Sequence, residues 1–280
     1  MILSILQTVL VLYVEFTAEV TEGPHMMVDW LTILMCIIIA FIGGFICIYT
    51  VGYMKEYHQH HKNVKDRQPF FFSMLFLFLA AMFGLVLSQN LIWIYFFWEI
   101  TSVISFLMIG YTRTEEAVGN SFCALWMNLL GGLGFAIAIV LMALGQESLQ
   151  LTEVVSTGAL LPLMCLSLAG LTKSAQLPFS TWLLGAMVAP TPSSALLHSA
   201  TMVKAGVYLL IRISPALSGN LVGLIVSSIG GLTFIMASMM AIAQNDAKKV
   251  LAFSTISNLG LIVACSGIGV EETVWGAIFL

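Results

Sequence analysis

Charged side chains are scarce in this sequence. Asp, Glu, Lys and Arg make up 9% of its 280 residues, whereas soluble domains carry about 25%. The hydrophobic fraction is 60% and the mean hydropathy is +1.02. These values exclude a soluble globular domain, and the few Lys and Arg residues exclude a basic nucleic-acid surface. We expect an integral membrane protein in contact with the lipid bilayer and with no nucleic-acid partner.

The sequence also lacks cysteine motifs for metals or clusters. No CxxC pair occurs, and all five cysteines lie inside apolar runs. They are Cys36, Cys47, Cys123, Cys165 and Cys265. We interpret them as small core residues. The histidines at 58, 60 and 61 resemble a metal cluster, but their place in a polar segment favours a solvated surface. We predict no metal site, no cofactor and no catalytic centre in this chain.

Long apolar runs alternate with short polar segments, which is typical of an all-α, polytopic membrane helix bundle. About nine transmembrane helices are predicted. They cover residues 30–53, 70–87, 91–111, 118–144, a span from 160, 193–211, 221–243, 250–268 and a span from about 273. Residues 1–13 are apolar but too short to span, and they lack the start and cleavage site of a signal peptide. We interpret them as a membrane-edge segment or part of a longer span.

The polar segments differ in positive charge between the two sides of the membrane. If successive spans alternate in direction, Arg212 alone falls on one side. The other side receives Lys55, Lys62, Lys65, Arg67, Arg113, Lys248 and Lys249. The positive-inside rule places that second side, with the loop 54–69, in the cytoplasm and residues 1–29 outside. We predict a multi-pass protein of the cell's inner (plasma) membrane.

A charged residue and a proline interrupt the fifth apolar run. Pro178 removes a backbone donor and clashes with the preceding turn, so the helix should break just after Lys173. Lys173 lies thirteen residues beyond position 160, roughly 20 Å into the membrane at 1.5 Å per residue. A broken helix beside a buried charge is tolerated in lipid only where protein or a water-filled cavity surrounds it. The segment therefore indicates a functional site.

Two more charged residues are predicted at a similar depth. Glu99 lies eight residues into its span, roughly 12 Å, and Lys204 lies eleven residues into its span, roughly 17 Å. A hydrocarbon core is about 30 Å thick, so both lie near its middle. His198 shares the span of Lys204 and lies nearer the cytoplasm. Ionisable residues at this depth are costly and typically mark ion pathways.

These residues suit a proton relay. Attraction between Glu99 and Lys173 would lower the cost of burying both charges. A buried lysine beside a carboxylate can alternate between its charged and neutral forms, and histidine can pass protons through its two nitrogens. The residues alone leave structural roles open: an ion pair that locks the bundle, a hydrogen-bonded core histidine at 198, and an interior anchor at Lys204.

Four long segments resemble one protein family. They read NLIWIYFFWEITSVISFLMIGY, TKSAQLPFSTWL, GAMVAPTPSSALLHSATMVKAGVYLLIR and QNDAKKVLAFSTISNLG. They resemble the antiporter-like proton-channel family. This family includes large membrane-arm subunits of respiratory complex I, matching subunits of energy-converting membrane-bound hydrogenases, and large subunits of Mrp-type cation/proton antiporters. The resemblance covers roughly residues 29–260.

The resemblance implies a role for each buried residue. Glu99 would be the membrane glutamate of the channel, and Lys173 the central proton carrier at the helix break. His198 and Lys204 would pass protons along the midplane of the membrane. The resemblance also implies a fold of two inverted five-helix repeats, each with one broken helix.

The same resemblance predicts the organisation of the chain. Residues 1–29 would be an outward-facing N-terminal segment, and 30–69 a leading span and cytoplasmic loop. Residues 70–212 would form the first inverted repeat, a proton half-channel, and 213–280 the start of a second, incomplete repeat. Because relatives continue through a full second repeat, we expect a fragment, a split gene product or an incomplete sequence.

Three functions follow from these expectations. The main one is a proton-translocating membrane subunit of a redox-driven multi-subunit ion pump, of the energy-converting hydrogenase or complex I type. Its partners would be other membrane subunits and a soluble redox module of hydrogenase or dehydrogenase subunits, with protons and possibly Na+ as the ions moved. The alternative is an Mrp-type cation/proton antiporter subunit. A structural scaffold subunit with buried ion pairs is the third.

Overall fold

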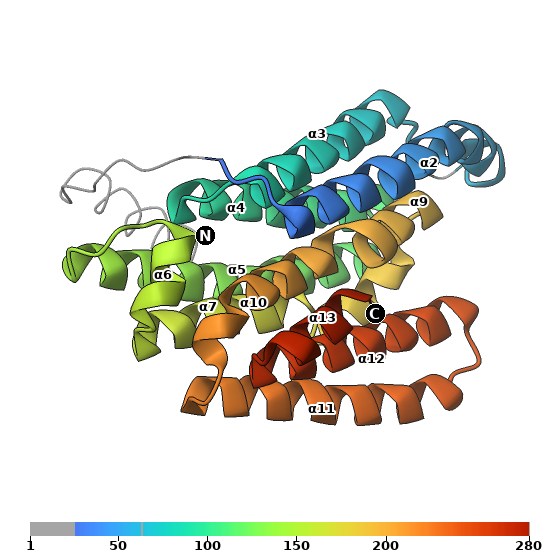
Figure 1. Ribbon diagram of the computed structural model, residues 1–280. Helices are drawn as coiled ribbons and strands as arrows, with labels where there is room; N and C mark the ends of the chain where they lie inside the picture. The colour runs from blue at the N-terminus through green and yellow to red at the C-terminus, as the bar shows by residue number, and fades with distance from the viewer. Residues whose placement is uncertain (1–25, 63, 280) are drawn as a thin grey trace.

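The structure is a computed structural model that describes residues 26–62 and 64–279, and in these ranges α-helices follow one another through short turns (Figure 1). Of the predicted N-terminal segment, residues 1–25 lie outside the described part. The α-helices are α2 (Trp30–His60), α3 (Gln68–Leu87), α4 (Leu91–Ile109), α5 (Glu115–Leu144), α6 (Leu151–Thr157), α7 (Leu160–Lys173), α8 (Thr181–Gly185), α9 (Thr191–Ala195), α10 (Met202–Leu217), α11 (Leu221–Ile242), α12 (Ala247–Ile268) and α13 (Glu271–Phe279).

Seven helical segments of the described chain are long and apolar enough to cross a membrane. They are Trp30–His60, Gln68–Leu87, Leu91–Thr112, Glu115–Leu144, Thr191–Leu217, Leu221–Ile242 and Ala247–Ile268. The other two predicted spans correspond to α7, with 14 residues, and α13, with 9 residues. Large apolar side chains stay exposed on the outer helices, as lipid contact requires; Trp30, Phe41 and Ile48 of α2 are examples. A polytopic helical membrane bundle is confirmed.

Helix α2 extends further than its apolar run. The predicted loop 54–69 is helical as far as His60 and again from Gln68. Aromatic side chains stack along this extension, since the Tyr57 ring lies 5.7 Å from that of Tyr53 and 4.3 Å from that of His61. Residues four apart share one helix face, so this stacking stabilises turns that hydropathy alone does not predict.

The predicted span 193–211 lies within the apolar helical segment Thr191–Leu217, but the helix is interrupted within it. Helix α9 leads into a π-helical turn, η3 (Leu196–Ala200), and the backbone leaves helical geometry at Thr201 before α10 begins. The Thr201 hydroxyl donates to the Leu196 carbonyl at 2.6 Å, five residues back. This bond satisfies a backbone carbonyl that the widened turn frees. The interruption is therefore tolerated within the membrane.

Side-chain contacts agree with the predicted alternation of the loops. Arg212, at the end of the sixth span, forms an ion pair with Asp29, which caps the first. At the other end of the bundle, Arg67 donates to the Tyr111 carbonyl at 2.5 Å, and His58 Nε2 lies 3.1 Å from the Tyr111 hydroxyl. Residues assigned to the same side of the membrane therefore meet in space.

Small residues let the central helices approach closely. A Cβ atom at Gly131 of α5 would lie 2.0 Å from Thr172 Oγ1 of α7, and one at Gly206 of α10 would lie 2.5 Å from the Gly170 carbonyl of α7. Such close backbone approach is typical of membrane bundles, in which packing replaces the hydrophobic effect between helices. Helix α7 is thereby enclosed between α5 and α10.

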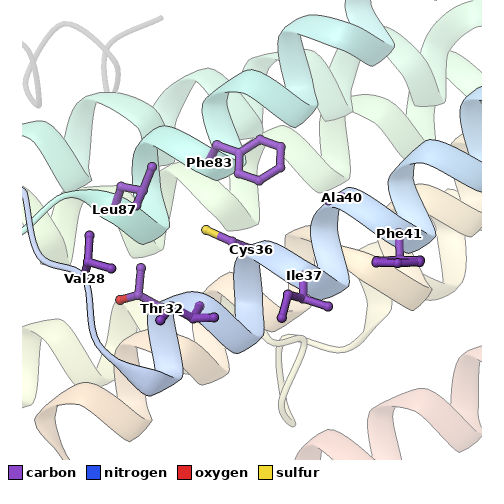
Figure 2. Close-up of a pocket in the computed structure, with 9 residues that line it drawn as sticks. Val28, Thr32, Cys36, Ile37, Ala40, Phe41, Phe83 and Leu87 are labelled. Carbon is purple, nitrogen blue, oxygen red and sulfur yellow. The ribbon is translucent and has the colours of Figure 1, made fainter.

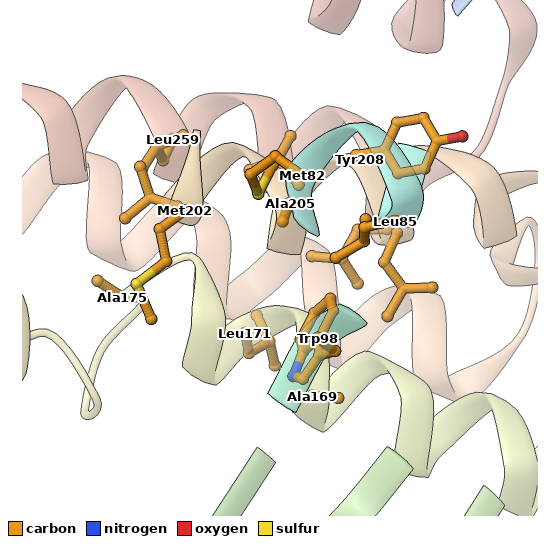
Figure 3. Close-up of a cluster of buried hydrophobic side chains, with 14 of the residues drawn as sticks. Met82, Leu85, Trp98, Ala169, Leu171, Ala175, Met202, Ala205, Tyr208 and Leu259 are labelled. Atoms are coloured by element: carbon orange, nitrogen blue, oxygen red, sulfur yellow. The ribbon is translucent and has the colours of Figure 1, made fainter. Parts of the chain in front are cut away.

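The core surrounds α7, and lipid-facing grooves lie outside it. Figure 3 shows buried side chains of this core, among them Trp98, Leu171 and Met202. An open apolar groove of about 340 Å³ lies between α2 and α3. Figure 2 shows its lining, to which Cys36, Phe41 and Phe83 belong. The groove holds no charged side chain, whereas the charged residues predicted from the sequence lie deeper in the bundle.

Candidate functional site

The helix break lies where the sequence predicts it, just after Lys173. Helix α7 ends at this residue, and a turn segment precedes α8. Ala175 adopts a left-handed conformation with φ of 53°. The Leu177 amide donates to Thr233 Oγ1 of α11 at 3.1 Å, and the Trp182 indole donates to the Thr172 carbonyl at 3.0 Å. These bonds fix the broken segment and satisfy backbone groups that the break frees.

The Lys173 side chain is fully buried, with 0% of its surface exposed. Its Nζ donates to three oxygens of α4, which we call the α4 cradle: the Trp98 carbonyl at 2.9 Å, Thr101 Oγ1 at 2.8 Å and Ser102 Oγ at 2.8 Å. The ammonium also lies 4.8 Å from the centre of the Trp98 ring. All three donors of the ammonium thus have acceptors, and a cation–π contact adds to them.

Glu99 directly follows Trp98 in α4 and lies beside this cradle, close enough to Lys173 for a coulombic interaction. The direct pair that we expected is absent, because the ion pairs of the described residues within 4.0 Å are His58–Asp66 and Arg212–Asp29. Successive residues of a helix point roughly 100° apart, so Glu99 cannot share the face of its neighbour Trp98. Its Oε1 is buried and has no hydrogen-bond partner among the described residues.

His198 lies in the π-helical turn η3. Both of its ring nitrogens are buried and lack a hydrogen-bond partner within the described chain. The structure therefore does not bond His198 to Lys173 or Glu99. Both nitrogens of the ring stay available for hydrogen bonding, and π-helical turns recur at functional positions of membrane and soluble proteins.

Lys204 lies in the first turn of α10 and is half-buried. It lines a cavity of about 70 Å³ together with Leu34, Tyr208 and Leu259. Its helix meets α7 at Gly206 and Gly170, so the helix of Lys204 packs directly against the helix that ends at Lys173. The structure brings Glu99 and Lys173 together and places Lys204 on the adjacent helix.

Sequence reasoning missed the α4 cradle. Thr101 and Ser102 follow Glu99 by two and three residues, and each hydroxyl also donates to the Trp98 carbonyl, at 2.7 and 3.0 Å. The sequence signal for the cradle is a pair of hydroxyl residues about one turn after an aromatic residue, within an apolar run. That pattern does not indicate which helix faces it, so the lysine could not be assigned to it.

The solvated-surface interpretation of the loop histidines is wrong for one of the three. His60 and His61 are exposed, but the His58 side chain is only 9% exposed. Its Nε2 lies between the Tyr111 hydroxyl and Asp66, the latter at 3.5 Å. The cause is the extension of α2, which carries His58 against the end of α4.

A charged pair anchors the opposite end of the bundle. Arg212 donates to both carboxylate oxygens of Asp29 and, at 2.6 Å, to Thr32 Oγ1. The guanidinium holds the pKa of the Asp29 carboxyl well below its usual range. An apolar groove of about 740 Å³ opens beside the pair, with Trp30 and Trp275 in its lining.

A fully buried lysine at a helix break inside a membrane bundle agrees with the comparison with known sequences. The family described as "NADH:quinone oxidoreductase/Mrp antiporter, TM" matches residues 88–280. The chain belongs to this family. A second family, "NADH-Ubiquinone oxidoreductase (complex I), chain 5 N-terminus", matches residues 23–63. Together with the apolar helices, these matches identify a multi-pass protein of the plasma membrane.

The relatives found are antiporter proteins. The chain is 40% identical over 252 residues to "Na(+)/H(+) antiporter subunit A1" of Staphylococcus haemolyticus, and 39% identical over 251 residues to "Putative antiporter subunit mnhA2" of Staphylococcus aureus. Each match covers 86% of this chain and 30% of the relative. The structure of the Mrp complex from Dietzia sp. DQ12-45-1b superimposes with a TM-score of 0.81 at 30% identity, covering 99% of this chain and 32% of that one.

The names of these relatives bear on the functions expected from the sequence. The chain spans about 30% of the length of the curated relatives that it matches. Their names favour the antiporter alternative. The redox-driven pump that we expected first is supported only by the family description, which also includes NADH:quinone oxidoreductase. A soluble redox module, expected as a partner, finds no support in them.

Proposed function

We propose that this chain forms the proton-handling part of an Mrp-type Na+/H+ antiporter subunit. Three relatives carry names of this kind, namely a Na+/H+ antiporter subunit, a putative antiporter subunit and an Mrp complex. The chain would act within a multi-subunit membrane complex and move ions without changing covalent bonds. Protons, and Na+ in exchange, would be the ions moved.

One observation carries this proposal. Lys173 ends a broken helix with its ammonium fully buried, and the ammonium reaches across to α4 beside Glu99. A purely structural lysine would be expected to pair directly with its carboxylate, because burying both charges unpaired is costly. Here the ammonium is held by neutral oxygens, and the carboxylate lies close enough to act on it through its field.

In the proposed pathway Lys173 exchanges a proton, and Glu99 controls how tightly that proton is held. His198 and Lys204 pass protons toward the part of the bundle formed by α11 and α12. The two ring nitrogens of His198, which have no hydrogen-bond partner among the described residues, suit proton transfer in both directions. Lys204 follows on the helix packed against α7, beside its own small cavity.

The division of the chain belongs to the same proposal. Residues 70–212 would form one half-channel of the inverted-repeat fold, and residues 213–280 would begin the second. The loop between α2 and α3 would face the cytoplasm, and the Asp29–Arg212 pair would lie at the outer face. Seven Lys and Arg residues on one side and one on the other support this orientation.

The test is Glu99→Gln in the full protein within its complex. We expect Na+-dependent proton exchange in inverted vesicles to fall about tenfold or more, because about 1.4 kcal/mol of lost attraction already changes an equilibrium tenfold. The matched control is Ser105→Ala. Ser105 lies on the same helix and its hydroxyl bonds the Thr101 carbonyl and Met202, without touching Lys173. Normal exchange by an assembled Glu99→Gln protein would contradict the proposal.

A further inference from the structure

We propose that the α4 cradle is a binding site for a monovalent metal cation, and that the Lys173 ammonium and this cation exclude each other from it. The cradle consists of the Trp98 carbonyl, Thr101 Oγ1 and Ser102 Oγ. The inference rests on the proposed function only for the identity of the cation as Na+. Its basis is the way these three oxygens surround the Lys173 Nζ.

The cradle presents oxygen lone pairs to whatever occupies it. An ammonium has donors but no acceptor, so both hydroxyls must accept from Nζ. Their own protons point elsewhere, because Thr101 Oγ1 donates to the Trp98 carbonyl at 2.7 Å and Ser102 Oγ donates to it at 3.0 Å. A hard metal cation requires the same orientation, since carbonyl and hydroxyl oxygens are its usual ligands. The hydroxyls are therefore already arranged for a cation.

The charge around the cradle matches a single positive charge. Its three oxygens are neutral. The carboxylate of Glu99 follows Trp98 directly, and its buried Oε1 has no hydrogen-bond partner in the part of the chain that the structure describes. The negative end of the α7 dipole, at Lys173, adds a partial charge. Calcium sites in proteins typically use several carboxylates, and magnesium keeps several bound waters, for which this enclosed site leaves no room beside its three oxygens. One carboxylate, one partial charge and neutral oxygens favour a monovalent cation.

Occupation by two cations at once is excluded by contact distances and by repulsion. The ammonium lies 2.8–2.9 Å from all three oxygens, so it fills their common centre. A second unit charge next to it would be repelled strongly in a site without solvent exposure. A metal cation can enter only when the lysine side chain leaves. This exclusion would by itself make the occupancy of the site by Na+ and by the lysine ammonium alternate.

The test removes the lysine and measures cation binding at equilibrium. The purified full complex carrying Lys173→Met should bind ²²Na+ saturably, and unlabelled Na+ should compete for the site. We expect its affinity for Na+ to be at least about tenfold higher than that of the wild type. The smaller variant Lys173→Ala is measured in parallel. If one of the two variants fails to assemble, the other still provides the test. Binding no stronger than in the wild type, in an assembled variant, would overturn the inference.

A second substitution assigns the binding to the cradle. Adding Thr101→Val to Lys173→Met removes one ligand oxygen at nearly constant volume. We expect the affinity for Na+ to fall tenfold or more, because Thr101 Oγ1 is one of the three oxygens of the cradle. Thr101→Ser should keep the affinity, and so should Ser105→Ala. Equal affinities in the Val and Ser variants would mean that Na+ binds elsewhere, which contradicts the proposal.

The binding assay separates this inference from the proposed function. It uses no ion gradient, so it does not depend on transport. If the wild-type complex exchanges Na+ for protons but the lysine variants gain no site, the inference alone fails. If the wild-type complex shows no exchange, the proposed function fails whatever the variants bind.

Discussion

The contact between α7 and α10 sets the position of Lys173, and Gly206→Ala tests this directly. A Cβ atom at position 206 would lie 2.5 Å from the Gly170 carbonyl oxygen, 2.7 Å from the Ser174 amide nitrogen and 3.0 Å from Lys173 Cβ. The first two are backbone atoms and cannot rotate away. The two helices must therefore shift by several tenths of an ångström, and the shifted segment is the end of α7 that carries Lys173.

The magnitude follows from packing and hydrogen bonding. Overpacking a closely packed helix contact costs about 1–3 kcal/mol. The same displacement lengthens the bonds from Nζ to the α4 cradle, and each hydrogen bond to a charged group contributes about 1.5–3 kcal/mol. We expect Gly206→Ala to lower the unfolding temperature in detergent and to reduce Na+-dependent proton exchange about tenfold.

Gly231→Ala is the matched control. Gly231 lies in α11, and a Cβ atom there would meet no atom within 4 Å. Alanine has the higher helix propensity, so this variant should be as stable as the wild type or more stable, with normal exchange. Unchanged stability and exchange in Gly206→Ala would show that the α7–α10 contact does not position the lysine.

Two further predictions concern the Asp29–Arg212 pair. Arg212→Gln should lower the free energy of unfolding by about 0.2–1 kcal/mol, because the pair is partly exposed. The loss should shrink as the NaCl concentration is raised. A loss that is independent of salt would contradict an electrostatic origin. The pair should also make stability depend on pH. The folded-state pKa of Asp29 is lowered, so its contribution is present above the unfolded value of 3.8 and is lost as the pH falls below it. Wild-type stability should therefore decline more steeply on acidification than that of Asp29→Asn, and parallel curves would refute this.

The spans could be predicted from the sequence because hydropathy is a local property. Residues 70–87 and 91–111 are predominantly apolar, and the helices α3 and α4 occupy nearly the same positions. The break after Lys173 was predictable as well, since Pro178 lacks a backbone donor. Local chemistry of this kind does not depend on what the helix packs against.

The interruption near Thr201 could not be predicted from composition. No proline or glycine lies in Leu196–Thr201, and the sequence there suits a regular helix. A side-chain bond from Thr201 to the Leu196 carbonyl stabilises the π-helical turn. Hydroxyl residues form such bonds in only some contexts, so the tertiary environment decides between a regular and a widened turn.

The partners of Lys173 depend on which helix faces α7. Depth along each span correctly suggested that Glu99 and Lys173 lie at a similar level. Depth does not give the rotation of a helix about its axis, and this rotation turns Thr101 and Ser102 toward the lysine. The rotation of α4 depends on packing that exists only in the folded bundle, such as the contacts of Tyr95 and Trp98 with Phe135 of α5.

The central claim is that the proton on Lys173 moves, and Lys173→Arg tests it most directly. Arginine keeps the positive charge and its donors, but it does not release its proton in proteins. We predict that the full complex carrying Lys173→Arg assembles and shows no Na+-dependent proton exchange in inverted vesicles. If Lys173→Arg exchanges protons at the wild-type rate, the buried charge is needed only for structure, and the account of Lys173 as a proton carrier is wrong.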